Sequence, residues 1–279
     1  MAKRALLIGI NDYRGNGDLG GCVNDVMNIR DILKTFYGYS NKEIRVLTDR
    51  RATKENILFR LKKLVSLSKS GDTLFVHYSG HGAQIRDRNN DELSDGMDEL
   101  ICPHDMDWDG TFITDDDLNK IFRILNKGVH LEVVMDCCHS GSNLKEFNFN
   151  RPADLGPEHP RVARRMIPPQ DIQCRFDGEE DDLEAKRFNT ITKDGSNRIL
   201  WAGCKDYQTS SDAWIAGDYN GAFTFYFCDH IRGMDGKITR KELIKRVRTS
   251  LRNLGFDQIP QLEFNATKKA DIYGNIIGK

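Results

Sequence analysis

Two short segments of the chain contain the residue types needed for nucleophilic chemistry. One is His77-Tyr78-Ser79-Gly80-His81-Gly82, and the other is Asp136-Cys137-Cys138-His139-Ser140-Gly141. Each segment ends an apolar, strand-like run, so two parallel strands lying side by side would bring His81 and Cys138 to the same edge of a sheet. A thiol beside an imidazole makes a nucleophile with its proton carrier.

The alternation of side chains along a strand predicts which residues share the cleft. Successive side chains point to opposite faces, so Asp136 and Cys138 lie on one face and Cys137 on the other. By the same rule Ser79 and His81 share a face of their strand. We therefore expect Cys138, Asp136, Ser79 and His81 to meet in one cleft, with Cys137 buried behind it.

The positions on either side of His81 are glycines, and this arrangement gives a physical reason for that choice. Gly80 and Gly82 permit unusual backbone angles and a close approach of substrate. The N–H groups of Gly82 and Cys138 could hold a developing oxyanion, and losing one such donor typically costs ~2.7–4 kcal/mol of barrier. No third side chain is evident for a triad, so we expect a backbone carbonyl to orient His81.

Strands alternate with amphipathic helices along most of the chain. Predicted strands cover Arg4–Ile10, Glu43–Thr48, Asp72–His81, Leu100–Pro103, His130–Cys138, Asn197–Cys204 and Gln261–Phe264. Predicted helices cover Val23–Tyr37, Thr53–Ser68, Thr114–Leu125, Gly221–Arg232 and Thr239–Gly255. This βαβ rhythm indicates an α/β fold with a mostly parallel central sheet between helices.

One long segment interrupts the pattern. Residues 142–196 are rich in charge, proline and glycine without a sustained period, which predicts a flexible linker. We expect one domain made of a large subregion at 1–141, this linker, and a small subregion at 197–279.

Composition narrows the function classes. The chain has 279 residues, of which 39% are hydrophobic, and a net charge of −1, which gives no sign of a nucleic-acid or membrane partner. No apolar stretch is long enough to span a bilayer. Seven cysteines, an odd number without a CxxC motif, favour a reduced cytoplasmic protein over a disulfide or zinc framework.

The chain resembles the metacaspases, called orthocaspases in bacteria, of the caspase-like cysteine peptidases (family C14, clan CD). The two segments quoted above match, as do five others: Ala5-Leu6-Leu7-Ile8-Gly9-Ile10-Asn11-Asp12-Tyr13, Gly21-Cys22-Val23-Asn24-Asp25, Gly203-Cys204-Lys205-Asp206-Tyr207-Gln208-Thr209-Ser210, Gly221-Ala222-Phe223-Thr224 and Gln258-Ile259-Pro260-Gln261-Leu262. The resemblance covers nearly the whole chain except the linker. It implies the three-layer caspase-hemoglobinase fold.

The resemblance also implies an activity. Family members cleave proteins after Arg or Lys, with Cys138 as the nucleophile and His81 as the base. The pocket for the basic side chain would be lined by Cys22, Asp25, Ser79 and Asp136. The negative charge of the two aspartates agrees with this specificity, because carboxylates attract a basic side chain and repel an acidic one. Without the family, Asp25 would read as a solvated residue at a helix start, favoured there by the helix dipole.

Calcium and self-cleavage are two further implications. Many metacaspases are activated by calcium held by aspartates, here Asp98, Asp115 and Asp116, whereas other orthocaspases do without it. Members often cut themselves between the two subregions. Our hypothesis is that the chain cuts itself after one or more of the basic residues that we expect to be exposed in the linker, which are Arg161, Arg164, Arg165, Arg175, Lys186 and Arg187. The alternative is that they belong to a solvated, charged loop.

Two rival functions stay open. One is a caspase-fold scaffold that binds partners without cutting them, although the intact His and Cys pair argues against it. The other is a related peptidase specific for Asn or Asp. The resemblance favours a monomer.

Overall fold

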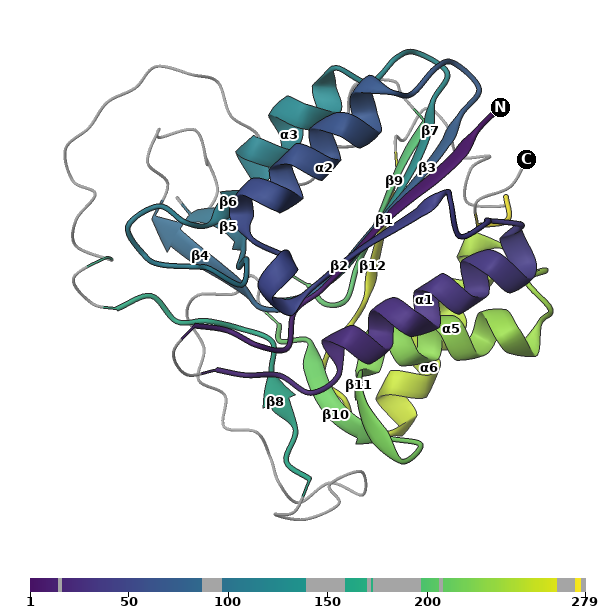
Figure 1. The fold of residues 1–279 in the computed structure, drawn as a ribbon. Coiled ribbons are helices and arrows are strands. Elements are labelled where there is room, and N and C mark those ends of the chain that lie inside the picture. The colour runs from purple at the N-terminus through teal and green to yellow at the C-terminus, as the bar shows by residue number, and fades with distance from the viewer. Residues whose placement is uncertain are drawn as a thin grey trace.

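A six-stranded sheet forms the centre of the computed structural model, which describes residues 1–14, 17–86, 97–138, 159–169, 172, 197–205, 208–264 and 274–276. The strand order is β12-β9-β7-β3-β1-β2, all parallel except β12 (Figure 1). Their bounds are β1 Lys3–Gly9, β2 Ile44–Thr48, β3 Thr73–Ser79, β7 His130–Asp136, β9 Asn197–Ala202 and β12 Gln261–Phe264. The predicted mostly parallel sheet is confirmed.

Helices cover both faces of this sheet (Figure 1). On one face lie α2 (Lys54–Ser66) and α3 (Asp115–Arg123), and on the other lie α1 (Cys22–Tyr37), α5 (Ala222–Gly233) and α6 (Arg240–Asn253). A 3-10 turn, η1 (Asp49–Arg51), precedes α2. Two apolar cores result, one on each face. The amphipathic helices form because each buries one stripe against the sheet.

Threonine caps explain where three of the helices begin. Thr53, Thr114 and Thr239 each accept a hydrogen bond from the backbone N–H three residues later. The carboxylate of Asp117 in turn accepts from the Thr114 N–H, which completes an acidic capping box.

Two small sheets flank the central one. The first is β4-β5-β6, with bounds Gly82–Arg86, Met97–Ile101 and Ile113–Thr114, all antiparallel. The second is β11-β10-β8, with bounds Asp218–Gly221, Ser211–Ile215 and Val162–Ala163, also antiparallel. The predicted strands leave out β4, β6, β8, β10 and β11, because strands of two to five residues leave little periodic signal.

The structure corrects two further predictions. Strands β3 and β7 end at Ser79 and Asp136, two residues before the expected ends at His81 and Cys138. The expectation that residues 142–196 lack regular structure is wrong at Val162–Ala163, which form β8. The proposed boundaries of the two subregions stay a prediction.

No helix among the described residues is long and apolar enough to cross a membrane.

Candidate active site

The carboxyl ends of β3 and β7 bring the two chemically reactive segments together. Ser79 pairs with Asp136 as the last residues of neighbouring parallel strands. His81 and Cys138 each follow two residues later, and both side chains are buried. The edge therefore gathers the predicted residues, at a place where α/β folds bind ligands.

A backbone carbonyl fixes the ring of His81. The carbonyl oxygen of Gly17 lies 2.5 Å from His81 Nε2. Because a carbonyl oxygen can only accept, Nε2 carries the proton, and the neutral ring keeps a lone pair on Nδ1. This contact is of the kind expected in place of a third side chain. Burial lowers the pKa of His81, which the bond to Gly17 opposes, so the neutral form is favoured near pH 7.

Two tyrosines hold the backbone around His81. Its N–H donates to the Tyr13 hydroxyl at 2.8 Å, and its carbonyl accepts from the Tyr78 hydroxyl at 2.6 Å. The rings of Tyr13 and His81 also pack together, with centroids 4.7 Å apart. The imidazole is thus fixed on both sides before any reaction begins.

The sulfur of Cys138 contacts the segment just before β10. The backbone N–H of Ser210 donates to Cys138 Sγ at 2.6 Å, and the sulfur lies 3.3 Å from the Ser210 carbonyl. Cys137 points away into the apolar core, as the strand alternation predicts.

A short piece of the linker region occupies the cleft between these groups. Its strand β8 pairs with β10, and Arg164 N–H continues the pairing by donating to Ser210 O at 3.1 Å. The carbonyl oxygen of Arg164 accepts from the N–H groups of Gly82 and Cys138, at 3.1 and 3.2 Å. Met166 N–H then donates to Gly82 O at 2.9 Å. The two predicted oxyanion donors thus meet on one peptide carbonyl.

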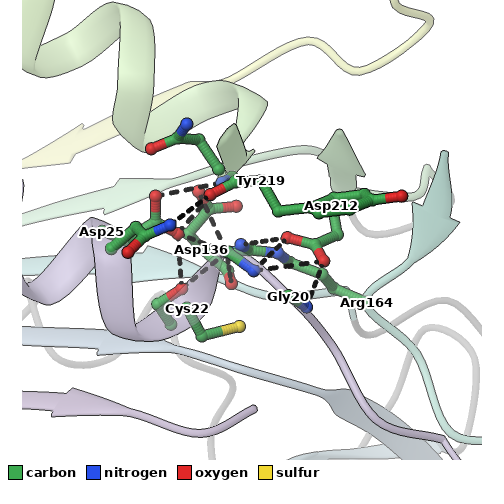
Figure 2. Close-up of polar contacts among 12 residues, drawn as sticks. Gly20, Cys22, Asp25, Asp136, Arg164, Asp212 and Tyr219 are labelled. Carbon is green, nitrogen blue, oxygen red and sulfur yellow. Dashed lines mark hydrogen bonds and ion pairs between the residues drawn. The ribbon is translucent and has the colours of Figure 1, made fainter. Parts of the chain in front are cut away.

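The side chain of Arg164 fills an acidic pocket (Figure 2). Its Nη1 lies 2.8 Å from Asp25 Oδ2 and 3.4 Å from Asp136 Oδ2, while Nη2 lies 2.9 Å from Asp212 Oδ1. Nη1 also donates to Ser79 Oγ at 2.6 Å. The guanidinium is 0% exposed. All four of these partners are side-chain oxygens, the acceptors that a guanidinium prefers.

Three elements hold the three carboxylates in place. Asp25, in the first turn of α1, accepts from Gly221 N–H at 3.0 Å. Asp136, at the end of β7, accepts from the Thr224 backbone N–H at 3.0 Å and from its hydroxyl at 2.6 Å.

The third carboxylate, on Asp212 of β10, accepts from Gly20 N–H at 2.7 Å and from Gly21 N–H at 3.1 Å. The acids are therefore fixed by backbone donors of the surrounding fold, which keeps them in position whether or not a cation is present.

Gly221 shows how closely the backbone approaches this pocket. A Cβ atom at that position would lie 2.5 Å from Arg164 Nη1 and from Asp25 Oδ2. Its φ of −66° is ordinary, so space rather than backbone angle requires glycine. Any side chain there would fill the pocket.

The pocket holds more negative than positive charge. Burial raises the pKa of Asp25 to about 7, against the lowering effect of Arg164 and with a further increase from Asp136. Cys22, the first residue of α1, is buried at the same place, and burial raises the pKa of its thiol. The reading of Asp25 as a solvated helix-start residue is wrong, since this side chain is fully buried.

The basic residues proposed as cleavage sites divide into three groups. Arg164 was expected to be exposed, and this is wrong because its side chain is fully enclosed by the three acids. Arg161 and Arg165 are partly buried. The others, Arg175, Lys186 and Arg187, lie outside the described residues.

The proposed calcium ligands belong to other elements than those of the acidic pocket. Asp98 belongs to β5, and Asp115 and Asp116 begin α3, directly after β6, which pairs with β5. Within the described parts of the chain, no group of three or more His, Cys, Asp or Glu residues is arranged to hold a metal ion. Calcium binding stays a prediction.

Sequence reasoning missed Asp212, Gly17 and Ser210 as parts of this site. Ser210 ends one of the family segments quoted above, so its motif was noticed without a role. Asp212 and Gly17 had no signal of their own: the first lies in an unrecognised short strand, and the second acts through its backbone.

A parallel sheet of this order, with a buried Cys and His at its carboxyl edge, defines a caspase-like cysteine peptidase. Comparisons with known proteins give the family. Residues 3–146 match the family model "Metacaspase, peptidase C14 domain". Metacaspase-1 of Ajellomyces capsulatus is 34% identical over 97% of this chain and 82% of its own length, and Metacaspase-1A of Aspergillus niger is 34% identical over 93% and 69%. The chain belongs to the metacaspases and is therefore a cysteine endopeptidase that acts on proteins.

Solved structures agree with the fold. Protein GSU0716 from Geobacter sulfurreducens superimposes with a TM-score of 0.72 at 23% identity, over 99% of this chain and 98% of that one. Caspase-1 from Spodoptera frugiperda gives a TM-score of 0.57 at 12% identity, over 94% and 86%. The caspase-like α/β fold predicted from the sequence is confirmed.

Proposed function

We propose that this endopeptidase cleaves after Arg or Lys, with Cys138 as nucleophile and His81 as base, and that one of its substrates is its own Arg164–Arg165 bond. One observation supports this above all others. A single residue, Arg164, places its guanidinium in an acidic pocket while its carbonyl accepts from the N–H groups of Gly82 and Cys138. A substrate about to be cut would need the same two contacts.

The proposed reaction follows from these positions. The thiol of Cys138 gives its proton to His81 Nδ1, while Nε2–H stays on the Gly17 carbonyl. The thiolate attacks the carbonyl carbon of the substrate Arg, and the Gly82 and Cys138 N–H groups stabilise the oxyanion. The imidazolium then protonates the departing amine, leaving a thioester. Water, losing a proton to His81, releases the product acid and the free thiol.

The acidic pocket accounts for the proposed specificity. Three buried carboxylates and the Ser79 hydroxyl surround a cation, and that hydroxyl already donates to Asp25. An Asp side chain entering this pocket would meet like charges in a water-poor environment, which costs several kcal/mol. This argues against the Asp-specific alternative, whereas the Asn-specific one is left to the peptide panel.

Cleavage of a peptide panel tests the activity. Fluorogenic peptides ending in Arg, Lys, Asp or Asn are offered to the wild type and to Cys138→Ala, with and without calcium. We expect turnover of the Arg and Lys peptides by the wild type only, and we retain the prediction that calcium increases it. Equal turnover by Cys138→Ala, or a preference for Asp or Asn, would overturn the proposal.

Intact-mass spectrometry tests self-cleavage. The wild type should yield fragments 1–164 and 165–279, Cys138→Ala should remain whole, and Arg164→Ala should lose this cut. Arg123→Ala is the matched control, because that arginine is exposed at the end of α3. Cutting of the wild type at other bonds only would contradict the assignment of Arg164.

We further infer a monomer that works in the cytoplasm. All six cysteines within the described residues are free thiols, which agrees with a reducing compartment. Size-exclusion chromatography with light scattering, and cell fractionation, test these two points.

A further inference from the structure

The contacts of the segment in the cleft do not end at the acidic pocket. Three residues before Arg164, the side chain of Arg161 reaches a different part of the protein. Its guanidinium carbon lies 4.1 Å from the centroid of the Phe256 ring. Nη1 donates to Gly255 O and Nη2 to Leu254 O, both at 3.3 Å. One side chain thus makes a stacking contact and two hydrogen bonds at the same place.

The chemistry of this place suits a cation. Helix α6 ends at Asn253, so the carbonyls of the next residues lie at the negative end of its dipole. Gly255 turns the chain in the left-handed region, with φ 73°, and the N–H of Phe256 returns to Leu251 O at 2.9 Å. This turn points two carbonyls and one aromatic face toward the same guanidinium. An aromatic face attracts a cation through its quadrupole.

The turn belongs to the body of the enzyme rather than to the bound segment. Phe256 is part of the apolar core beneath α5 and α6, whereas Arg161 and Arg164 lie in the segment that pairs with β10. The backbone pairing of that segment fixes the spacing between the two arginines. A peptide bound in the same register would place on this turn the residue that lies three positions before its cleaved Arg or Lys.

We propose that residues Leu254–Phe256 form a second arginine subsite, which makes the enzyme select substrates with Arg three residues before the cleaved Arg or Lys. This inference rests on the proposed function, since it assumes that the segment lies as a substrate does. The ligand class is an extended peptide of the form Arg-x-x-Arg. The sequence Arg161-Val162-Ala163-Arg164 is the internal example.

Peptide cleavage by the self-processed enzyme tests the subsite. The probes are coumarin amides of Arg-Val-Ala-Arg, Ala-Val-Ala-Arg, and the same peptide with citrulline first, which keeps the shape of arginine without its charge. We expect kcat/KM about 10-fold higher for the Arg peptide than for the Ala peptide, with citrulline close to Ala. Values within twofold of each other would overturn the subsite while leaving the proposed function intact.

Substitution of the aromatic ring assigns the effect to this turn. In Phe256→Leu the preference for the Arg peptide should fall to about threefold or less, because the carbonyls remain and the ring is gone. A folding defect would lower both rates together and leave their ratio unchanged. Phe59→Leu is the control, since that ring is exposed on α2 and its loss should leave the ratio at the wild-type value. An unchanged ratio in Phe256→Leu would contradict the assignment.

A binding measurement tests whether the arginine subsite exists, even if no peptide is cut. Fluorescence polarisation follows labelled Arg-Val-Ala-Arg-Arg-Met and its Ala-first counterpart on Cys138→Ala/Arg164→Ala, in which the internal segment lacks its anchoring arginine. We expect the Arg-first peptide to bind at least fivefold more tightly. Equal Kd values would overturn the subsite, whereas absence of cleavage with unequal Kd values would overturn only the proposed function.

Discussion

Two buried arginines of this fold, Arg240 and Arg164, are surrounded by different numbers of acidic side chains. Among the described residues, Arg240 pairs with the carboxylate of Glu132, with Nε to Oε1 at 3.0 Å and Nη2 to Oε2 at 2.8 Å. Arg164 faces three carboxylates through the two ends of its fork. The first is a matched bidentate pair between a strand and a helix. The second is a cation on a linker segment, surrounded by more negative charge than it can neutralise.

The pKa values of the acids reflect this difference. Burial alone would raise the pKa of Glu132, but Arg240 and a hydrogen bond from His130 lower it to about 2. At Asp25, burial exceeds the effect of Arg164 and the pKa rises to about 7. The Arg240–Glu132 ion pair, with one charge of each sign, stabilises the fold. The three acids around Arg164 outnumber the single cation, and we interpret them as a site from which the cation can be exchanged.

The largest expected difference is in stability. Arg240→Met removes the guanidinium that faces the buried carboxylate of Glu132 and should lower the free energy of unfolding by ~3–5 kcal/mol. Arg164→Met should cost less than half as much, because the segment can withdraw and water can enter the pocket. Urea unfolding, with both substitutions in Cys138→Ala to keep the chain whole, measures this. Equal losses would mean that Arg164 is a structural residue rather than a removable occupant.

The sequence predicts the central sheet and its reactive edge much better than it predicts the occupied acidic pocket. The strands that end near His81 and Cys138, and the helices begun by Thr53, Thr114 and Thr239, follow from local patterns of a few residues. The central sheet and its gathering of Cys138 and His81 at one edge could therefore be predicted.

The occupied pocket could not be predicted in the same way. Its acids lie at positions 25, 136 and 212, and the arginine that joins them lies in a stretch whose composition indicates a solvated loop. Burial of Arg164 depends on pairing between β8 and β10, two short strands far apart in the chain. The residues near each strand in the sequence give no indication of a contact over such a distance along the chain.

The pH dependence of stability should have opposite signs in the two regions. Asp25, faced by Arg164, Asp136 and Asp212, binds a proton in the folded state between about pH 4 and 7 that the unfolded chain has lost. Its contribution to the free energy of unfolding therefore falls as pH rises through that window. Glu132, faced by Arg240 and His130, keeps its charge down to about pH 2, so its contribution is lost as pH falls from about 4 toward 2.

Two variants separate the contributions of Asp25 and Glu132 to the change of the free energy of unfolding with pH. Between pH 5 and 7, the wild-type pocket should lose stability relative to Asp25→Asn by at most about 1.4 kcal/mol per pH unit for one proton. Glu132→Gln should show no such difference in that range, and should differ from the parent in its slope only below about pH 4.5. Urea unfolding in Cys138→Ala at each pH measures both. Parallel curves for the parent and Asp25→Asn would mean that Asp25 is already ionised at pH 5.

Exchanging each arginine for lysine should have the smallest effect on self-cleavage and stability. It distinguishes recognition of the positive charge from recognition of the guanidinium geometry. A guanidinium spans Asp25 and Asp212 with separate nitrogens, whereas an ammonium is a compact, strongly hydrated point charge that cannot reach both at these distances. We expect Arg164→Lys to slow self-cleavage about 10-fold without abolishing it, as followed by intact mass over time. Arg240→Lys, which loses its bidentate bond, should lower the free energy of unfolding by about 1–2 kcal/mol and leave the self-cleavage rate unchanged. If Lys at position 164 is cut as fast as Arg, the pocket recognises charge alone, and the fork geometry has no part in its selectivity.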